Sequence, residues 1–159
     1  MGLKVNAVID AGPLIHLREI GAEKALSIFD LLTTQGVVEE VRSVPEKVKI
    51  SNNFDKNLVA ILQNDFSLGL GECQCIALAK AEKIPLLLTD DLDARTTALS
   101  LGLEPHGTVG IILKAYRSKV FSKSEALSFL MRLKSSSTLY ITSGLIKYIV
   151  AQIEKRRNG

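Results

Sequence analysis

Short apolar runs alternate along the chain with longer segments in which apolar residues recur every three or four positions. Two of the apolar runs, at residues 5–9 and 85–88, predict buried strands. Strand and helix patterns alternate, so we expect an α/β fold, a three-layer α/β/α sandwich with a central parallel sheet. The helical period predicts helices at residues 14–20, 22–32, 72–82, 94–101, 107–116, 124–134 and 141–156.

The segments between these elements carry weaker signals. Gly36 is expected to end the second helix, and Val37-Val38 is expected to form the end of a strand. Residues 43–56 are polar and predict a loop, and so do residues 135–137. Residues 58–63 fit either a strand or a short helix, and the pattern does not separate the two.

The composition indicates a single domain, residues 1–159, with an aliphatic core. Hydrophobic residues make up 47% of the 159 positions and aromatic residues only 5%, a balance typical of a buried parallel sheet. Cys73 and Cys75 are too few to build a disulfide framework. The chain shows neither a signal-peptide pattern nor an apolar run of about 20 residues, so we expect a cytoplasmic protein with no membrane partner. The net charge of +3 neither requires nor excludes a nucleic-acid partner.

Acidic residues fall where the predicted elements end or begin. Asp10 closes the first strand, and Asp90 and Asp91 follow the second. Glu40 follows a short apolar run, and Glu72 opens a helix directly after a glycine turn. In an open parallel sheet, ligands bind beyond the carboxyl ends of the strands. We therefore expect these carboxylates to meet in one cleft.

Several carboxylates in one cleft stay ionised together only when a cation neutralises them. Oxygen ligands select Mg²⁺ or Mn²⁺, which leave positions open for water and a substrate phosphate, so the pattern favours phosphodiester hydrolysis. Each acid also has a structural interpretation: Thr89 or Asp90 fits a helix N-cap, and Glu72 and Asp93 fit first-turn acids that offset a helix dipole. The position of Asp10 predicts no capping role.

The acidic segments, in their order along the chain, resemble the motifs of PIN domains. The resemblance extends roughly from residue 5 to residue 150 and is greatest for an uncharacterised prokaryotic PIN-like subfamily related to VapC-type toxins. It implies a nuclease fold whose acidic pocket binds Mg²⁺ or Mn²⁺ and whose substrate is single-stranded RNA. It also implies the toxin of a toxin–antitoxin pair, with an antitoxin protein as partner, and a homodimer. The segments that carry it are VIDAGPLI (8–15), VVEEV (37–41), GECQCIALA (71–79), LTDDLDAR (88–95) and GTVGII (107–112).

The same resemblance assigns roles to individual residues. Thr89 matches a hydroxyl that often precedes the last acids of the family, while Ala11-Gly12 stands where members usually carry Thr or Ser. The implied catalytic acids are Asp10, Glu40, Glu72 and Asp91, with Glu39 as the register alternative to Glu40. The implied metal ligands are Asp10, Glu72, Asp90, Asp91 and Asp93. Thr89 and Arg95 are the candidate substrate-binding residues; Arg95, about one helical turn beyond Asp91, also fits a structural ion pair.

Two other functions fit parts of the sequence. The missing hydroxyl at Ala11-Gly12 is compatible with a PIN-like module that binds RNA or a protein without cleaving. The segment Asp91-Leu92-Asp93 is similar to the two-aspartate motif of haloacid dehalogenase-like phosphatases. His16 is expected to be a half-buried helix residue. The three tyrosines, Tyr116, Tyr140 and Tyr148, are scattered and predict no base-stacking surface.

Overall fold

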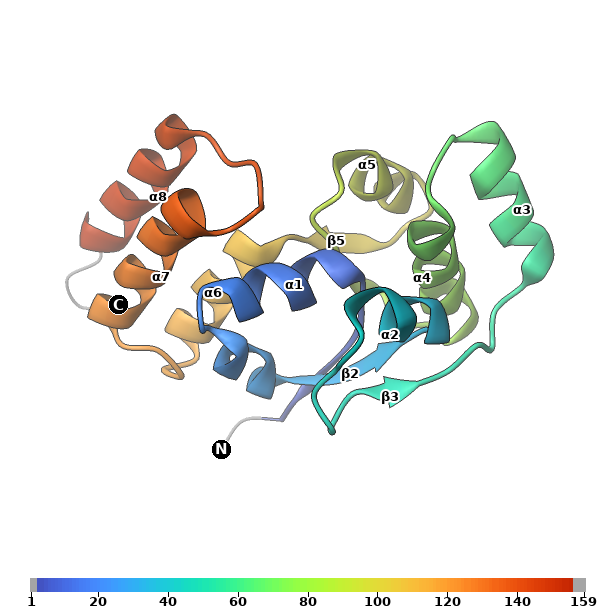
Figure 1. Ribbon diagram of the computed structural model, residues 1–159, viewed down its shortest axis with the longest axis horizontal. Helices are drawn as coiled ribbons and strands as arrows, with labels where there is room; N and C mark the ends of the chain where they lie inside the picture. Colours follow the sequence, from blue (N-terminus) through green and yellow to red (C-terminus); the bar gives the residue numbers. More distant parts are fainter. Residues whose placement is uncertain (1–2, 156–159) are drawn as a thin grey trace.

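The protein is built on one parallel sheet, as a computed structural model describes it for residues 3–155. Five strands lie in the order β3-β2-β1-β4-β5, and every neighbouring pair is parallel. The expected α/β/α sandwich is confirmed (Figure 1). The strands are β1 (Val5–Ile9), β2 (Phe29–Thr33), β3 (Lys49–Ile50), β4 (Leu86–Leu88) and β5 (Glu104–His106).

Helices connect the strands and cover the sheet on both faces. The chain moves outward from β1 through β2 to β3, then crosses back to β4 and β5, so right-handed connections place α1 and α2 on one face and α3, α4 and α5 on the other. The last helices continue the first face, where α6 contacts α1 and α7 contacts both α6 and α8. The helices are α1 (Ala11–Glu19), the 3₁₀ helix η1 (Glu23–Ile28), α2 (Gln35–Val41), α3 (Lys56–Asp65), α4 (Leu70–Ala81), α5 (Leu92–Ser100), α6 (Thr108–Arg117), α7 (Lys123–Ser136) and α8 (Ser143–Lys155).

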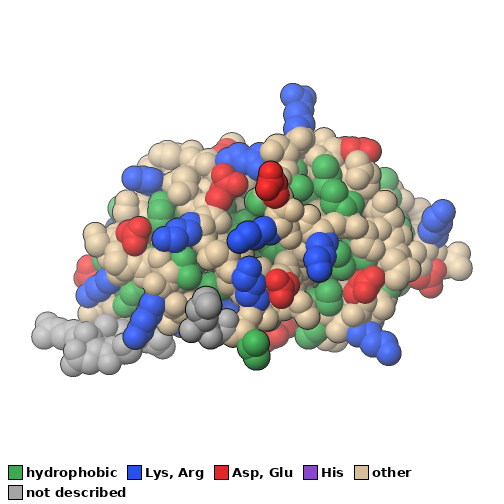
Figure 2. All heavy atoms as spheres, turned by 90° about the horizontal axis from the view of Figure 1, so that it is seen from below, with side chains coloured by type: hydrophobic (Ala, Val, Ile, Leu, Met, Phe, Trp, Pro, Cys, Tyr) green, Lys and Arg blue, Asp and Glu red, His purple; other side chains and the backbone are tan. Residues whose placement is uncertain are grey.

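The central strands and the helix α4 form the core. Ala7, Val8 and Ile9 of β1 are completely buried, as expected for a strand covered on both faces. Cys73 and Cys75 lie in α4 as free, buried thiols, in agreement with the absence of a disulfide framework. No helix within residues 3–155 is both long and apolar enough to cross a bilayer. On the face seen from below, basic and acidic side chains are interspersed (Figure 2).

The prediction of one helix over residues 22–32 is wrong. The structure has the short helix η1 followed by β2, in which Phe29, Leu31 and Thr33 are buried and Asp30 is exposed. That two-residue alternation was hidden because the apolar spacing of this segment also fits a helix. Pairing of β2 with β1 along four registered positions decides in favour of the strand.

The predictions for Gly36 and Val37-Val38 are also wrong. Both lie within helix α2, which begins after Thr34, whose hydroxyl accepts the Val37 N–H. Gly36 does not end a helix: it lies in the first turn of α2, where an added Cβ would meet the flexible end of the Gln74 side chain of α4, 2.8 Å from its Oε1.

The remaining boundaries shift for identifiable reasons. Helix α1 starts at Ala11, three positions before the predicted start. Pro13 does not interrupt it, because a residue in the first turn of a helix needs no N–H for the helical hydrogen bonds. The ambiguous segment 58–63 is helical and belongs to α3. The short strands β3 and β5 escape detection because they have only two and three residues, and residues 135–136 extend α7 instead of forming a loop.

Candidate functional site

A pocket of about 280 Å³ lies at the point where the order of the strands reverses. The chain leaves β1 in one direction and enters β4 from the other, so the carboxyl ends of these paired strands leave a crevice between them. The strands that precede Asp10 and Asp90 are thus direct neighbours in the sheet. The acids that line the pocket are Asp10, Glu40, Glu72, Asp90 and Asp91.

Asp10 lies at the bottom of the pocket, directly after β1. Its Oδ1 accepts the Ala11 N–H at 2.8 Å, and its Oδ2 accepts the Thr89 hydroxyl at 3.1 Å. Asp10 thus caps helix α1, and the expectation that it has no capping role is wrong. Burial, with smaller contributions from the negative charges of Glu72 and Glu40, raises the pKa of Asp10 from 3.8 to about 6.

Glu40 and Glu72 enter the pocket from helices on opposite faces of the sheet. Glu40 lies on α2 and not at a strand end as expected; it lines the pocket, whereas Glu39 does not. Glu72 lies in the first turn of α4, as predicted, and is half-buried. Both glutamates are near enough to Asp10 to disfavour its ionised form, which places the three carboxylates in one electrostatic environment.

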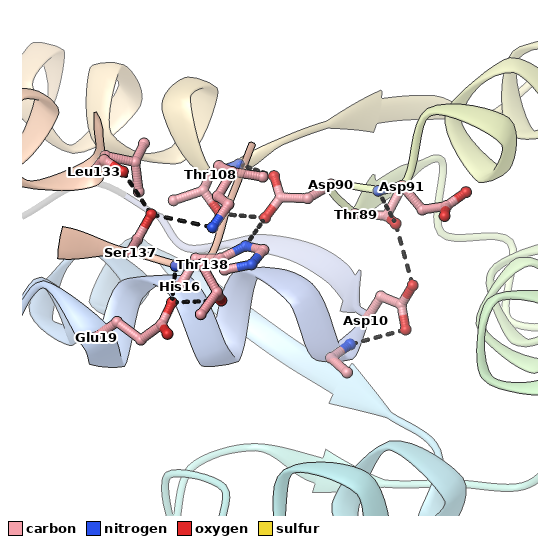
Figure 3. A network of polar contacts seen from close by, with 12 residues as sticks. Asp10, His16, Glu19, Thr89, Asp90, Asp91, Thr108, Leu133, Ser137 and Thr138 are labelled. Atoms are coloured by element: carbon pink, nitrogen blue, oxygen red, sulfur yellow. Dashed lines mark hydrogen bonds and ion pairs between the residues drawn. The ribbon is translucent and has the colours of Figure 1, made fainter. Parts of the chain in front are cut away.

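Asp91 and Asp90 are adjacent in sequence but have different surroundings. Asp91 is exposed at the N-terminus of α5, where its Oδ1 accepts the Ala94 N–H at 2.8 Å. Asp90 is largely buried, and both its oxygens are bound by protein groups (Figure 3). Within residues 3–155, no group binds the second carboxylate oxygen of Asp91, which leaves it available to a ligand, whereas Asp90 links segments around the pocket.

The contacts of Asp90 join three segments of the chain. Asp90 Oδ1 accepts the Thr108 N–H at 2.6 Å, and its Oδ2 lies 2.6 Å from both the Thr108 hydroxyl and His16 Nδ1. A Cβ at Gly107 would lie 2.8 Å from Oδ1, so the carboxylate packs against bare backbone. This network fixes the N-termini of α6 and α5 against α1. We refer to Asp90, His16 and Thr108 as the Asp90 network.

The other predicted residues have different positions. The Thr89 side chain is buried at the lining of the pocket, and its hydroxyl joins Asp10 to the Asp91 N–H, so it positions these acids. Asp93 is exposed and does not line the pocket, which separates it from Asp91. Arg95 lies outside the acidic pocket, beside Gly107, and forms no ion pair with any residue in the described range 3–155.

One wall of the pocket comes from a loop that the sequence did not indicate. Thr138, Leu139 and Tyr140, between α7 and α8, line the pocket. Glu19 Oε1 at the end of α1 accepts both the N–H and the hydroxyl of Thr138 at 2.9 Å (Figure 3). We call residues 138–140 the loop wall.

The donor set of the pocket suits a hard cation. Its ligand atoms are carboxylate oxygens, which Mg²⁺ and Mn²⁺ prefer. In the described part of the chain, no three His, Cys, Asp or Glu side chains are already arranged to hold a metal ion. The acids thus match a divalent cation in chemistry, and side-chain rotation would be needed to bring them together around it.

The comparison with protein-family models identifies the fold family. A model described as a PIN domain, of the family DUF3368, matches residues 6–155. The chain belongs to the PIN-domain family. PIN domains are typically nucleases that bind nucleic acid and use divalent metals, which agrees with the acidic pocket. Searches of curated proteins and of solved structures give no match.

Three parts of the site were not predicted from the sequence: His16, Thr108 and the loop wall. His16 was expected to be only a half-buried helix residue, yet it lines the pocket and binds Asp90. The available signal was its spacing: Gly12 and His16 are four positions apart and share the face of α1 that lines the pocket. Thr108 and the loop wall gave no comparable signal.

Proposed function

We propose that this PIN-domain protein is a metal-dependent endoribonuclease that hydrolyses phosphodiester bonds of single-stranded RNA, with Mg²⁺ or Mn²⁺ as cofactor. The observation that carries the proposal is the convergence of Asp10, Glu40, Glu72 and Asp91 on one pocket. These acids come from two strand ends and two helices, and no capping requirement brings all of them to the same place. Burial and mutual repulsion make the site unfavourable for the protein alone, as expected for a site built for a cation.

The residues divide into ligands and supports. Asp10, Glu72 and Asp91 would hold the ions, and Glu40 would complete the pocket. Bound cations of this kind supply an activated water and stabilise the leaving oxygen. Thr89 orients Asp10 through its hydroxyl, while the Asp90 network keeps the strand end in place.

The direct test is cleavage of single-stranded RNA with Mn²⁺, comparing Asp91→Asn with Asp93→Asn. Asparagine is as good an N-cap as aspartate, so Asp91→Asn preserves helix α5 while removing a ligand charge. We expect Asp91→Asn to lower the cleavage rate by at least about 100-fold. Asp93 lies outside the pocket, so Asp93→Asn should stay close to wild type. Equal activity of the two variants would contradict the site.

The neighbours Glu39 and Glu40 give a second matched pair. Only Glu40 lines the pocket and contributes to the raised pKa of Asp10. We expect Glu40→Gln to reduce the metal-dependent cleavage rate by about tenfold or more, and Glu39→Gln to leave it unchanged. The rates are measured under subsaturating Mn²⁺, where loss of a weak ligand is most visible. The reverse order of the two rates would place the second acid at Glu39.

The biological setting follows from the resemblance to VapC-type toxins. We propose that the protein is a cytoplasmic toxin, forms a homodimer and is inhibited by an antitoxin encoded beside it. Expression in bacteria should then arrest growth, and co-expression of a small open reading frame immediately upstream should relieve the arrest. If expression of a chain that cleaves RNA leaves growth unaffected, the toxin role is contradicted. The nuclease proposal would then still be decided by the cleavage assay.

A second candidate function is a PIN-domain module that binds RNA or a protein without cleaving. It is favoured by Ala11 and Gly12, which leave no hydroxyl directly after Asp10 where PIN domains usually carry one. Both residues line the pocket, so the missing group would have faced the ligand. Binding of RNA without any cleavage in Mg²⁺ or Mn²⁺ would support this function over the nuclease.

A further inference from the structure

Two further hollows extend the acidic pocket into one groove. A hollow of about 630 Å³ between α5, α6 and α8 shares Asp90, Leu139 and Tyr140 with the acidic pocket. A smaller hollow of about 210 Å³ between α6 and α8 shares Leu113 and Ile149 with the first. Because neighbouring hollows share these lining residues, we treat them as one groove that runs from the acids, past the loop wall, to the space between α6 and α8.

All three tyrosines of the chain line this groove. Tyr140 stands where the acidic pocket meets the groove and is 88% exposed. Tyr148 on α8 is 64% exposed and lines the far hollow together with the half-buried Tyr116 of α6. The tyrosines that are scattered in sequence are therefore all found in the lining of this groove. Exposed aromatic rings along a groove are the platforms on which unpaired bases stack.

The charges along the groove are of the opposite sign to those of the pocket. Arg95 lines the larger hollow and Arg117 the smaller one. Among the described residues, Asp90 is the one acid that lines either hollow, and its oxygens are already bound by Thr108 and His16. An acidic pocket without bound cations repels the phosphates of a nucleic acid. The protein's affinity for RNA must then come from cationic and aromatic groups beside the pocket.

We propose that a single strand of RNA leaves the acidic pocket along this groove, with one base stacked on Tyr140 and another on Tyr148. Arg95 and Arg117 neutralise the phosphates between and beyond these bases. The proposal rests on the proposed function, because it extends the substrate of the same site. In this arrangement the apolar lining of the groove contacts the bases of the RNA, and the cationic side chains contact its sugar–phosphate backbone.

The binding test uses the full chain carrying Asp10→Asn, which prevents cleavage, with EDTA present. The affinity for a fluorescent single-stranded RNA of about 12 nucleotides is measured by anisotropy. Tyr148→Leu and Tyr140→Leu remove the stacking ring and keep an apolar side chain at an exposed position, so folding is retained. We expect each to weaken binding by about fivefold or more. Arg117→Gln should weaken binding and reduce its dependence on salt.

Matched controls separate the groove from the general surface. Phe66 is half-exposed at the end of α3, a helix that lies across the molecule from α8 in Figure 1, and it lines none of the three hollows. Phe66→Leu therefore removes an aromatic ring outside the groove. Arg42 is an exposed arginine at the end of α2. We expect Phe66→Leu and Arg42→Gln to bind RNA as the parent does. If the tyrosine variants also bind like the parent, the proposal is overturned and the groove is left for a protein partner.

A cleavage experiment distinguishes this proposal from the nuclease proposal. With the acids intact and Mn²⁺ present, Tyr148→Leu should lower kcat/KM for the longer RNA and leave a trinucleotide unaffected, since the trinucleotide does not reach α8. If both tyrosine variants cleave both substrates at wild-type rates, the proposal of RNA binding in the groove is overturned and the nuclease proposal stands. Tyrosine-dependent RNA binding by a chain that cleaves nothing would keep the groove and overturn the nuclease.

Discussion

Asp10→Asn is expected to abolish metal-dependent RNA cleavage and, in the absence of metal, to make the protein more stable. The loss of cleavage follows from the position of Asp10 at the bottom of the acidic pocket, where it is the most buried of the converging acids. Asparagine can still accept the Ala11 N–H and cap α1, so the local fold is preserved. We expect a rate lowered by at least about 100-fold.

The gain in stability follows from the raised pKa of Asp10. The folded protein holds this proton more tightly than the unfolded chain, so stability from this group is present below pH 3.8 and is lost as the pH rises to about 6. Above that pH the ionised carboxylate costs roughly 2–3 kcal/mol, given about 1.4 kcal/mol per pKa unit. Because asparagine does not titrate, the variant avoids this cost at neutral pH.

The measurement is urea denaturation in EDTA at pH 4 and at pH 7.5. The variant should exceed wild type by roughly 2–3 kcal/mol at pH 7.5, equivalent to about 5–10 °C in Tm, and by much less at pH 4. Adding Mn²⁺ should raise the Tm of wild type more than that of the variant, because the folded wild type binds the ion. A stability difference that does not change with pH would show that Asp10 is not strained by its charge.

Asp90→Ala is expected to destabilise the protein by about 3–5 kcal/mol, the largest stability effect that we predict for any pocket acid. The substitution leaves the Thr108 N–H, the Thr108 hydroxyl and His16 Nδ1 without their acceptor in a largely buried site. It also removes the link that fixes α6 and α1 to the end of β4. The free energy of unfolding is measured by urea denaturation in EDTA at neutral pH.

Asp93→Ala is the control for this prediction. Asp93 is an exposed acid in the first turn of α5, three positions from Asp90, and its loss should cost less than about 1 kcal/mol of helix-dipole stabilisation. The two variants remove the same charge from nearby positions, so the effect of the changed net charge cancels when their stabilities are compared. Equal stabilities would mean that the Asp90 network contributes little to the fold, and Asp90 would return to consideration as a metal ligand.

The parts of the site that the sequence predicted are those signalled by local pattern. Asp10 and Asp91 each follow an apolar run whose strand character is unambiguous, and the rule that carboxyl ends of parallel strands share an edge then brings them together. Glu40 was placed correctly but on the wrong element, because Val37 and Val38 suit a strand and only the cap at Thr34 shows that a helix starts there.

The parts that escaped prediction depend on contacts between distant segments. Asp90 binds His16 across 74 positions and Thr108 across 18, and neither partner has a distinctive neighbour in sequence. The presence of Tyr140 and Tyr148 in one groove depends on how α7 holds α8 beside α6, which no local pattern encodes. Hydrophobic periodicity predicts elements, whereas their relative placement comes from packing.

The loop wall also has a consequence for the order in which the protein becomes functional. Glu19 binds Thr138 across 119 positions, so this contact can form only after the long intervening segment has been made. A ribosome-bound chain that stops before Thr138 already contains every pocket acid but lacks one wall of the cavity. The cavity is therefore closed on this side only after a contact of long sequence separation has formed, so its completion depends on the tertiary fold and not on any local element.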